Sequence, residues 1–341
     1  MDYLEWLTAH TGTAWWHDSA DPAELTRGLA RGAVGVTTNP YLTALALNRN
    51  RAAWAAEIAE ALADNPPPER KAEALMRIVV TNAARQLAPT FERSRGALGY
   101  VCAQVNPARA GERDAMLEMA RRFHAWAPNI AVKLPATAAG LDVLEDGAAE
   151  GITTTATVSF TVPQVIAIAE RHRRALERAQ RNGAPSARCF AVIMIGRLDD
   201  YLREVAHDAR AIATESDVRQ AGLAVTKRAC SIYRERGYQA VLLVAALRGA
   251  YHMTELAGAE VVMSIAPKYQ EILLNDDLPR EERSSRDIAP DVIARLAQMP
   301  EFRRAYEPDG MTPREFIAFG LTQRTLAQFF EAGWGLLESF A

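Results

Sequence analysis

Eight short apolar runs recur along the chain, and this alternation with longer amphipathic stretches limits the fold more than any other feature of the sequence. The intervening segments, such as residues 110–127 and 163–180, are rich in Ala, Glu, Arg and Leu and carry apolar residues at helical spacing. Helices of this kind connect successive strands of a parallel sheet. We expect strands at residues 13–19, 33–39, 99–105, 129–136, 151–158, 189–197, 240–248 and 260–265.

A closed barrel of this type has eight strands with helices between them, and a chain of 341 residues is long enough to form one such barrel. We therefore predict an α/β fold, a single (β/α)8 TIM barrel with extra C-terminal helices, as one domain over residues 1–341. Within it, residues 276–341 are expected to form a surface excursion and then a terminal helix. The stretch 275–310 is polar and turn-rich, and the helix that follows is expected to pack on the outside of the barrel.

Composition and charge exclude several function classes. The net charge of -3 argues against the basic surface that nucleic acid or an anionic membrane requires. The amino terminus does not have the basic and apolar regions of a signal peptide, and no run approaches about 18 apolar residues. The three cysteines lie far apart without zinc-ligand spacing. We expect a cytoplasmic, metal-free protein that acts on a small molecule, and a homodimer is one arrangement that the sequence allows.

One lysine stands in the middle of an apolar run, NIAVKLPAT, at residues 129–137. Two-residue alternation puts Lys133 and Ala131 on one face of the expected strand, and we expect this face to point into the barrel. Desolvation there disfavours the ammonium form and leaves a fraction of free amine, which can attack a carbonyl group. The alternative is a structural lysine that pairs with a carboxylate or reaches water at the strand end.

Polar residues stand at the ends of the first two expected strands. Asp18 could carry a proton to and from a substrate hydroxyl, or could cap the helix that begins near Pro22. Asn39 and the preceding Thr38 belong to the motif TTNP and could bind substrate, and Asn39 could cap the next helix as well. Threonines at alternate positions of the fifth strand could line the interior, although threonine is also a common strand former: Thr153, Thr155 and Thr157.

Two arginines, Arg197 and Arg248, follow the sixth and seventh apolar runs. Arginines at neighbouring strand ends can clamp an anionic group, whereas each alone would more often be a surface residue. His17 and His252 also lie near strand ends but do not have metal-ligand spacing. The pattern predicts a site for a small anionic molecule at the carboxyl ends of the strands, where such barrels build their active sites.

The ordered segments GVTTNP, NIAVKLPAT, GITTTAT, IGRLDD, ALRGAYHMTELAG and MSIAPKYQEIL resemble motifs of the transaldolase family, from Asp18 to about residue 272. The combination of TTNP with VKLPAT is quite specific for that family. The resemblance implies a single (β/α)8 barrel, no cofactor, and a metal-independent class I mechanism on a sugar or sugar phosphate. In that mechanism a three-carbon dihydroxyacetone unit passes from a ketose to an aldehyde acceptor through a lysine Schiff base.

The resemblance also implies a role for each candidate residue. Lys133 matches the Schiff-base lysine, and Asp18 matches the acid that takes the proton of the C4 hydroxyl as the C3–C4 bond breaks. Asn39 matches the asparagine that holds substrate hydroxyls, and Thr157 the threonine that helps to position the catalytic water. The phosphate-binding arginines of the family match Arg197 and Arg248.

Four positions depart from the family pattern. Gln104 stands where transaldolases carry a glutamate that acts through water, and glutamine can hold that water but cannot take its proton. The short fructose 6-phosphate aldolase branch has glutamine there together with a tyrosine at the position of Met194. Val192 and Ala246 replace serines, and the loss at Ala246 removes a phosphate hydrogen bond worth about 1.5 to 3 kcal/mol.

Two alternatives to transaldolase activity therefore stay open. One is an aldolase or aldol-transferase specialised for a modified or unphosphorylated sugar in secondary metabolism. The other, from a different class, is a catalytically lapsed protein that binds a sugar without turnover.

Overall fold

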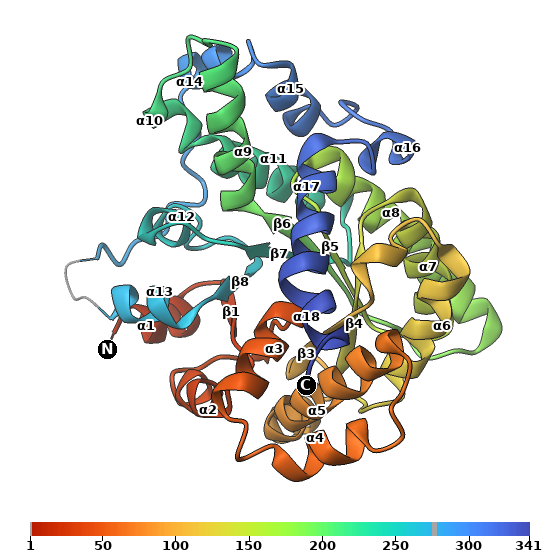
Figure 1. Ribbon diagram of the computed structural model, residues 1–341. Helices are drawn as coiled ribbons and strands as arrows, with labels where there is room; N and C mark the ends of the chain where they lie inside the picture. Colours follow the sequence, from red (N-terminus) through yellow and green to blue (C-terminus); the bar gives the residue numbers. More distant parts are fainter. Residues whose placement is uncertain (1, 275–277) are drawn as a thin grey trace.

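The computed structural model describes residues 2–274 and 278–341, and its centre is a closed barrel of eight parallel strands in chain order (Figure 1). Each strand pairs with the next, and the last pairs with the first. The predicted (β/α)8 barrel and all eight predicted strands are confirmed, with shorter bounds. The strands are β1 (Ala14–His17), β2 (Gly35–Val36), β3 (Tyr100–Gln104), β4 (Ile130–Pro135), β5 (Thr154–Thr157), β6 (Cys189–Met194), β7 (Val241–Ala245) and β8 (Val261–Ile265).

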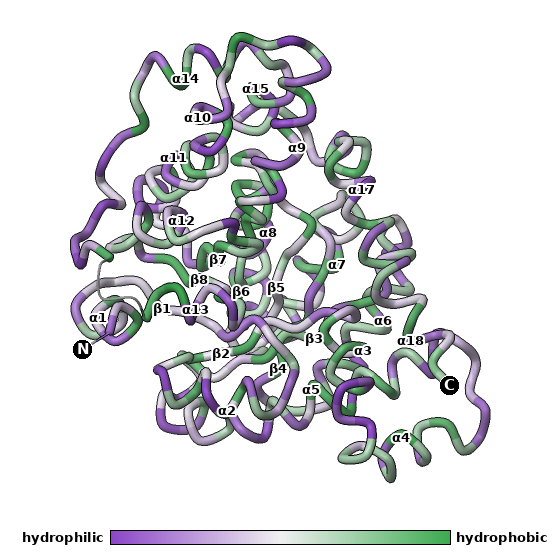
Figure 2. The backbone as a smooth tube through the Cα atoms, turned by 60° about the vertical axis from the view of Figure 1, so that its left-hand side comes forward, coloured by the Kyte–Doolittle hydropathy of each residue, from purple (hydrophilic) through white to green (hydrophobic). Residues whose placement is uncertain are grey.

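Helices surround this barrel, and Figure 2 shows the apolar strands at the centre with helices of mixed hydropathy around them. None of the helices in the described ranges is long and apolar enough to cross a membrane. In chain order they are α1 (Tyr3–His10), α2 (Pro22–Ala30), α3 (Pro40–Arg49), α4 (Ala55–Leu62), α5 (Pro68–Arg93), α6 (Arg113–His124), α7 (Ala138–Ala149), α8 (Val162–Asn182), α9 (Ile195–Asp208), α10 (Glu215–Val218), α11 (Ala221–Arg236), α12 (Ala250–Thr254), α13 (Pro267–Leu273), α14 (Pro290–Leu296), α15 (Pro300–Tyr306), α16 (Pro313–Phe316), α17 (Gly320–Phe329) and α18 (Gly335–Glu338).

Side-chain caps begin several of these helices directly beyond the strands. Asn39 accepts a hydrogen bond from the backbone N–H of Leu42 at the start of α3, and Thr137 and Thr161 cap α7 and α8 in the same way. Each cap satisfies a backbone donor that the first helical turn leaves free. The caps therefore fix where the chain turns at the carboxyl end of the barrel, which is where the site is expected.

Three aromatic rings fill the amino-terminal part of the barrel interior. The centroid of Phe190 lies 4.5 Å from that of Trp16 and 5.5 Å from that of Tyr100, and all three side chains are buried. Tyr100 begins β3, and two-residue alternation puts Gln104, at the other end of that strand, on the same inward face. These rings fill the barrel interior near the amino ends of the strands.

The terminal helix differs from its prediction. The structure divides it into α16, α17 and α18, with a π-helical turn at Phe330–Trp334 between the last two. A side chain at Gly333 would lie 2.9 Å from the backbone nitrogen of Tyr41, so only glycine permits this close contact with α3. Contacts of this segment with α9, with the 3₁₀ turn Pro107–Arg109 and with α3 carry it across the carboxyl ends of the strands, not only along the outside (Figure 1).

The predicted surface excursion holds more structure than its composition suggested. Residues 275–277 lie outside the described residues, but α14 and α15 form within 290–306. Val292, Leu296 and Phe302 are buried, and the two helices pack against α10 and α11. A turn-rich sequence can still form short helices when a few apolar side chains find a neighbouring surface.

Candidate active site

Lys133 lies on the inward face of β4, as the two-residue alternation predicts. Its side chain is 7% exposed, and its Nζ donates a hydrogen bond to the Thr38 carbonyl oxygen at 3.3 Å. In the sheet register it stands between Gln104 of β3 and Thr155 of β5. Within the described ranges Nζ has no other hydrogen-bond partner and forms no ion pair. The alternative of a lysine paired with a carboxylate is therefore not realised.

Asp18 follows the last residue of β1 and lies close enough to Lys133 for the two charges to interact. Its carboxylate accepts a hydrogen bond from Thr37 Oγ1 at 2.8 Å, and the Thr37 hydroxyl also contacts the hydroxyl of Ser264 in β8. Burial raises the pKa of Asp18 above its ordinary value, although the Thr37 hydrogen bond and the Lys133 charge partly oppose this. A carboxyl group in this state can both accept and return a proton.

The competing capping role for Asp18 belongs to another residue. Asp21 Oδ1 accepts hydrogen bonds from the backbone N–H groups of Ala23 and Glu24 at 2.9 and 3.0 Å, so Asp21 caps α2. The alternative role of Asp18 as the cap of this helix is therefore wrong. Its carboxylate is left facing the barrel interior.

Asn39 and Thr38 occupy the loop after β2 in different ways. The Asn39 side-chain oxygen caps α3, and its Nδ2 group has no partner among the residues that the structure describes. Those two N–H donors remain for a ligand. The Thr38 hydroxyl is fully buried and donates to the Cys102 carbonyl oxygen at 2.7 Å, so this residue presents its backbone carbonyl, not its side chain, to Lys133.

Gln104 is the register partner of Lys133 on β3, and Thr157 lies on β5 two residues beyond Thr155, the register partner of the lysine on that strand. Gln104 is 2% exposed, and its Oε1 is buried without a hydrogen-bond partner in the part of the chain that the structure describes. The Thr157 hydroxyl reaches only the Met194 sulfur, at 3.9 Å, which is a weak acceptor. Buried polar groups without partners are rare and usually mark a place where a water or ligand binds. Both groups therefore have hydrogen-bonding capacity to offer beside Lys133.

Arg197 and Arg248 come together at the ends of β6 and β7. Burial lowers the pKa of Arg197, and the neighbouring Arg248 charge lowers it further. Arg248 donates from Nε to Asp200 Oδ2 at 2.8 Å and from Nη1 to the Ala246 carbonyl oxygen at 2.8 Å. Two arginines held close enough to repel each other form a natural site for an anion.

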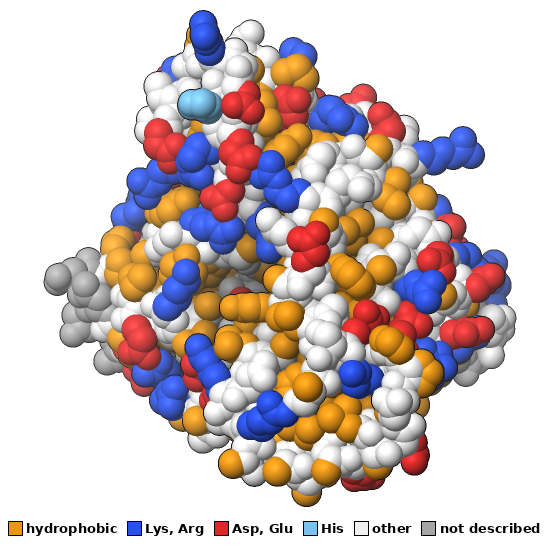
Figure 3. Space-filling view, viewed as in Figure 1, with side chains coloured by type: hydrophobic (Ala, Val, Ile, Leu, Met, Phe, Trp, Pro, Cys, Tyr) orange, Lys and Arg blue, Asp and Glu red, His pale blue; other side chains and the backbone are white. Residues whose placement is uncertain are grey.

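The carboxyl-terminal segment completes this end of the site. Arg197 Nη1 donates to Gln328 Oε1 at 2.6 Å, and its guanidinium lies 5.2 Å from the centre of the Phe329 ring. Figure 3 shows a hollow near the middle of this face, with Lys and Arg side chains along its upper edge and hydrophobic side chains beside it. Helix α17 runs alongside the barrel mouth in the same view (Figure 1). The mouth is therefore partly walled by a segment distant in sequence.

Comparison with known proteins decides the family. Residues 15–313 match the family described as Transaldolase/Fructose-6-phosphate aldolase, which is most of the chain. The chain belongs to this family. Its members transfer aldol units, so the protein is an enzyme of the transaldolase type.

Three relatives show how far this likeness extends. A transaldolase from Thiobacillus denitrificans is 28% identical over 306 residues, which are 85% of this chain and 82% of that protein. A transaldolase from Mycobacterium ulcerans is 32% identical over 220 residues, or 60% of this chain and only 56% of the relative. A probable transaldolase from Dehalococcoides mccartyi is 27% identical over 73% of this chain and 84% of its own length.

Three apolar residues make this end of the site less polar than the pattern expected of a transaldolase. Val192 and Met194 lie on the inward face of β6 and are nearly buried. Ala246 follows β7 and has a φ angle of +58°, a left-handed conformation that is strained for alanine. None of the three side chains can donate a hydrogen bond, so polar contacts at this end fall to the arginines.

Several residues of the site were not predicted from the sequence. Ser264 and Thr37 support Asp18 but lie in ordinary strand-like segments, and Gln328 and Phe329 reach Arg197 from the far end of the chain. Alternation along β8 could have marked Ser264 as inward. No group of three or more potential metal ligands occurs within residues 2–274 and 278–341.

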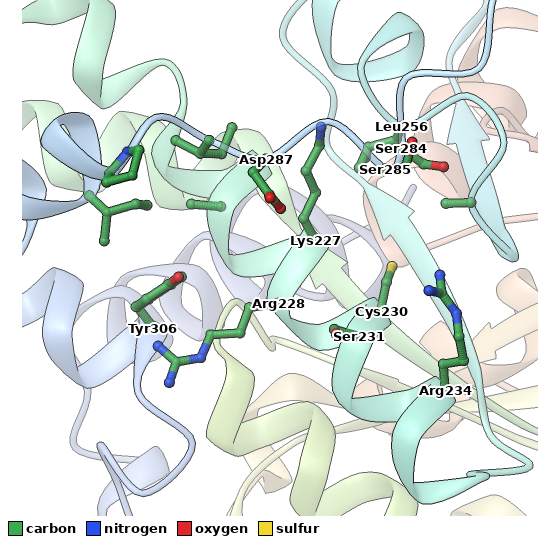
Figure 4. Close-up of a pocket in the computed structure, with 15 residues that line it drawn as sticks. Lys227, Arg228, Cys230, Ser231, Arg234, Leu256, Ser284, Ser285, Asp287 and Tyr306 are labelled. Atoms are coloured by element: carbon green, nitrogen blue, oxygen red, sulfur yellow. The ribbon is translucent and has the colours of Figure 1, made fainter.

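A second cavity, of about 610 Å³, lies away from the strand ends on the outer side of α11 (Figure 4). None of the predicted site residues lines it. Two of the three cations that line it already have partners, because Lys227 donates to the carbonyl oxygens of Arg283 and Arg286, and Arg228 pairs with Glu307. The barrel mouth, where the unpaired groups converge, is the candidate active site.

Proposed function

We propose that the protein catalyses a transaldolase reaction in which Lys133 forms a Schiff base with a ketose and transfers a dihydroxyacetone unit to an aldehyde. The observation that carries this proposal is a buried lysine without an ion-pair partner beside a carboxyl group whose pKa is raised. An amine in such surroundings is a suitable nucleophile for a carbonyl carbon.

In the first step the Lys133 amine attacks the ketose C2 carbonyl to give a carbinolamine, which loses water to become the imine. We assign the holding of that water to Gln104 and Thr157, and this is supported by the unused hydrogen-bonding capacity of both groups on the two strands that flank β4. Gln104 cannot itself take a proton, so it serves as a positioning group.

In the second step the C3–C4 bond breaks and the bonding electrons move toward the iminium nitrogen. Asp18 accepts the proton of the C4 hydroxyl, so the aldose leaves as a neutral aldehyde. The three-carbon unit stays on Lys133 as an enamine and attacks the acceptor aldehyde, and Asp18 returns its proton to the new hydroxyl. The free Nδ2 donors of Asn39 suit the substrate hydroxyls near this bond.

Borohydride trapping tests the proposal. With a ketose donor, reduction should leave a three-carbon adduct on Lys133 that mass spectrometry locates, and the Lys133→Met variant should give none. An adduct at another residue, or no adduct with a ketose whose binding is proven, would refute the Schiff-base mechanism. In the latter case the lapsed, sugar-binding alternative would hold.

A second candidate is aldol transfer on an unphosphorylated or modified sugar. It is favoured by the apolar Val192 and Ala246, and by the Asp200 carboxylate that already pairs with Arg248 at 2.7 Å. A phosphate must compete with that carboxylate. Comparing Lys133 adduct formation from fructose 6-phosphate and from fructose distinguishes the two candidates.

A further inference from the structure

A buried aspartate and histidine lie directly behind the arginine site. Asp199 and His252 are both fully unexposed, and His252 Nε2 lies 2.9 Å from Asp199 Oδ2. The other oxygen of Asp199 accepts the backbone N–H of Gly222 at 2.8 Å. The other nitrogen of His252, Nδ1, lies 3.2 Å from the backbone nitrogen of Arg248. These contacts link α9, α11, α12 and the loop after β7.

The contacts fix which ring nitrogen of His252 carries the proton. The backbone N–H of Arg248 can only donate, so Nδ1 must be an acceptor. Nε2 then carries hydrogen and donates to Asp199. The imidazole thus joins a backbone N–H on one side to a buried carboxylate on the other, and it can make both contacts only as the neutral Nε2–H tautomer.

The Asp199–His252 pair supports the loop of residues 246–248, whose strained backbone needs support from neighbouring residues. The loop runs from Ala246, with φ +58°, to Arg248, whose guanidinium is held by Asp200, the residue after Asp199. Backbone strain of this kind persists only where surrounding contacts enforce it. Residues 199 and 200 therefore hold Arg248 in two ways. Asp199 acts through His252, which binds the Arg248 backbone, and Asp200 binds the Arg248 side chain.

We propose that Asp199 and His252 are a positioning pair that sets the Arg248 backbone, and through it the affinity of the site for the anionic group of a substrate. The inference rests on the proposed function in assigning an anionic substrate to this site. It concerns binding of the anion only, since neither residue reaches Lys133 or the bond that breaks.

Two substitutions of His252 separate positioning from general stability. The side-chain oxygen of asparagine lies about where Nδ1 does, so His252→Asn keeps the acceptor for Arg248 and loses the donor to Asp199. The amide nitrogen of glutamine lies about where Nε2 does, so His252→Gln keeps the donor to Asp199 and leaves the Arg248 N–H unpaired. His252→Asn leaves the buried Asp199 carboxylate without its donor, and this lowers stability more than the single unpaired N–H that His252→Gln leaves.

The experiment measures three quantities for both variants: the urea midpoint, the affinity for inorganic phosphate by calorimetry, and KM for fructose 6-phosphate and for fructose. His252→Asn should have the lower urea midpoint. His252→Gln should nevertheless bind phosphate about three- to tenfold more weakly, with the same rise in KM for fructose 6-phosphate and no change for fructose. His172, which is buried on α8 with one backbone contact to Ala187, supplies the control, and His172→Gln should leave phosphate affinity unchanged.

The ranking of the two variants decides the inference. If phosphate affinity follows the urea midpoint, so that His252→Asn is the weaker binder, the pair is only structural and the inference is overturned. A parallel rise in KM for fructose would overturn it too, and so would a wild-type protein that binds no phosphate. Failure of the proposed function looks different: the wild-type protein then gives no Lys133 adduct, while the phosphate measurement still tests the pair.

Discussion

Arg197 Nη1 and Gln328 Oε1 lie 2.6 Å apart, and this contact joins the helix after β6 to the carboxyl-terminal helix α17. The same guanidinium lies over the ring of Phe329. Neither partner carries a negative charge, so the contacts orient Arg197 without neutralising it. Arg248, by contrast, is paired with Asp200. The two arginines are therefore unequal, and Arg197 retains more of its charge for a substrate.

A carboxylate at residue 328 should neutralise the Arg197 charge and so weaken its attraction for a substrate anion. Gln328→Glu keeps the shape of the side chain but forms an ion pair with Arg197, so a phosphate must displace a charged competitor. We expect KM for fructose 6-phosphate to rise about tenfold, which corresponds to about 1.4 kcal/mol, with KM for fructose unchanged. Gln328→Met, of similar size and uncharged, is the control. Equal effects on both sugars would indicate that α17 had moved instead.

Replacing Gln104 with an apolar residue should raise the stability of the protein and lower its activity. Its buried Oε1 has no protein partner within residues 2–274 and 278–341, so Gln104→Met removes a polar group that the protein itself does not satisfy and should raise the free energy of unfolding by about 1 kcal/mol. The variant cannot hold the catalytic water, and kcat should fall about tenfold or more. Gln164→Met is the matched control, because Gln164 is equally buried but bonds Phe160 and Val158, and it should lose stability. Urea titrations that rank the two variants the other way would contradict the argument.

Local patterns predicted the barrel and the inward position of Lys133 because both depend on alternation within one strand. Eight apolar runs marked the strands, and the two-residue period placed Lys133 of β4 on the face shared with Gln104 and Thr155. Every predicted strand extended too far at one end or both. At those ends the chain leaves the ladder to cap a helix, as Asn39 does, and apolar composition does not report that change.

Contacts between distant segments could not be predicted in this way. Nothing in the sequence near Gln328 indicates that it meets Arg197, because the two residues are brought together only by the path of α17 across the barrel mouth. The same holds for His252 and Asp199, whose pairing depends on how α9 lies against α12. Residue type and spacing describe one segment at a time, whereas these contacts depend on how segments pack.

Gly196 allows the Arg248 loop to approach α9. A Cβ atom at Gly196 would lie 2.3 Å from the Ala246 carbonyl oxygen and 2.4 Å from Arg248 Cγ, so Gly196→Ala must push the loop away. Overpacking of this kind should cost about 1 to 3 kcal/mol in urea unfolding and weaken phosphate binding. Gly111→Ala, where a Cβ atom would meet nothing within 4 Å, is the control. Unchanged phosphate affinity in Gly196→Ala would mean that Arg248 tolerates the shift.

Asp18→Asn should separate proton transfer from imine formation and should change stability in a pH-dependent way. Burial raises the pKa of Asp18, so the folded protein holds this proton more tightly than the unfolded chain, and wild-type stability is lost as pH rises through the folded pKa. Asparagine cannot ionise. The free energy of unfolding of the variant, relative to that of the wild type, should therefore increase as pH rises above about 4. It should become constant above the pKa of Asp18 in the folded protein. The kcat of the variant should fall about 10²- to 10⁴-fold. Imine formation does not need this proton transfer, so borohydride should still trap added dihydroxyacetone on Lys133. A stability difference that does not vary with pH, measured by urea unfolding, would rule out the raised pKa.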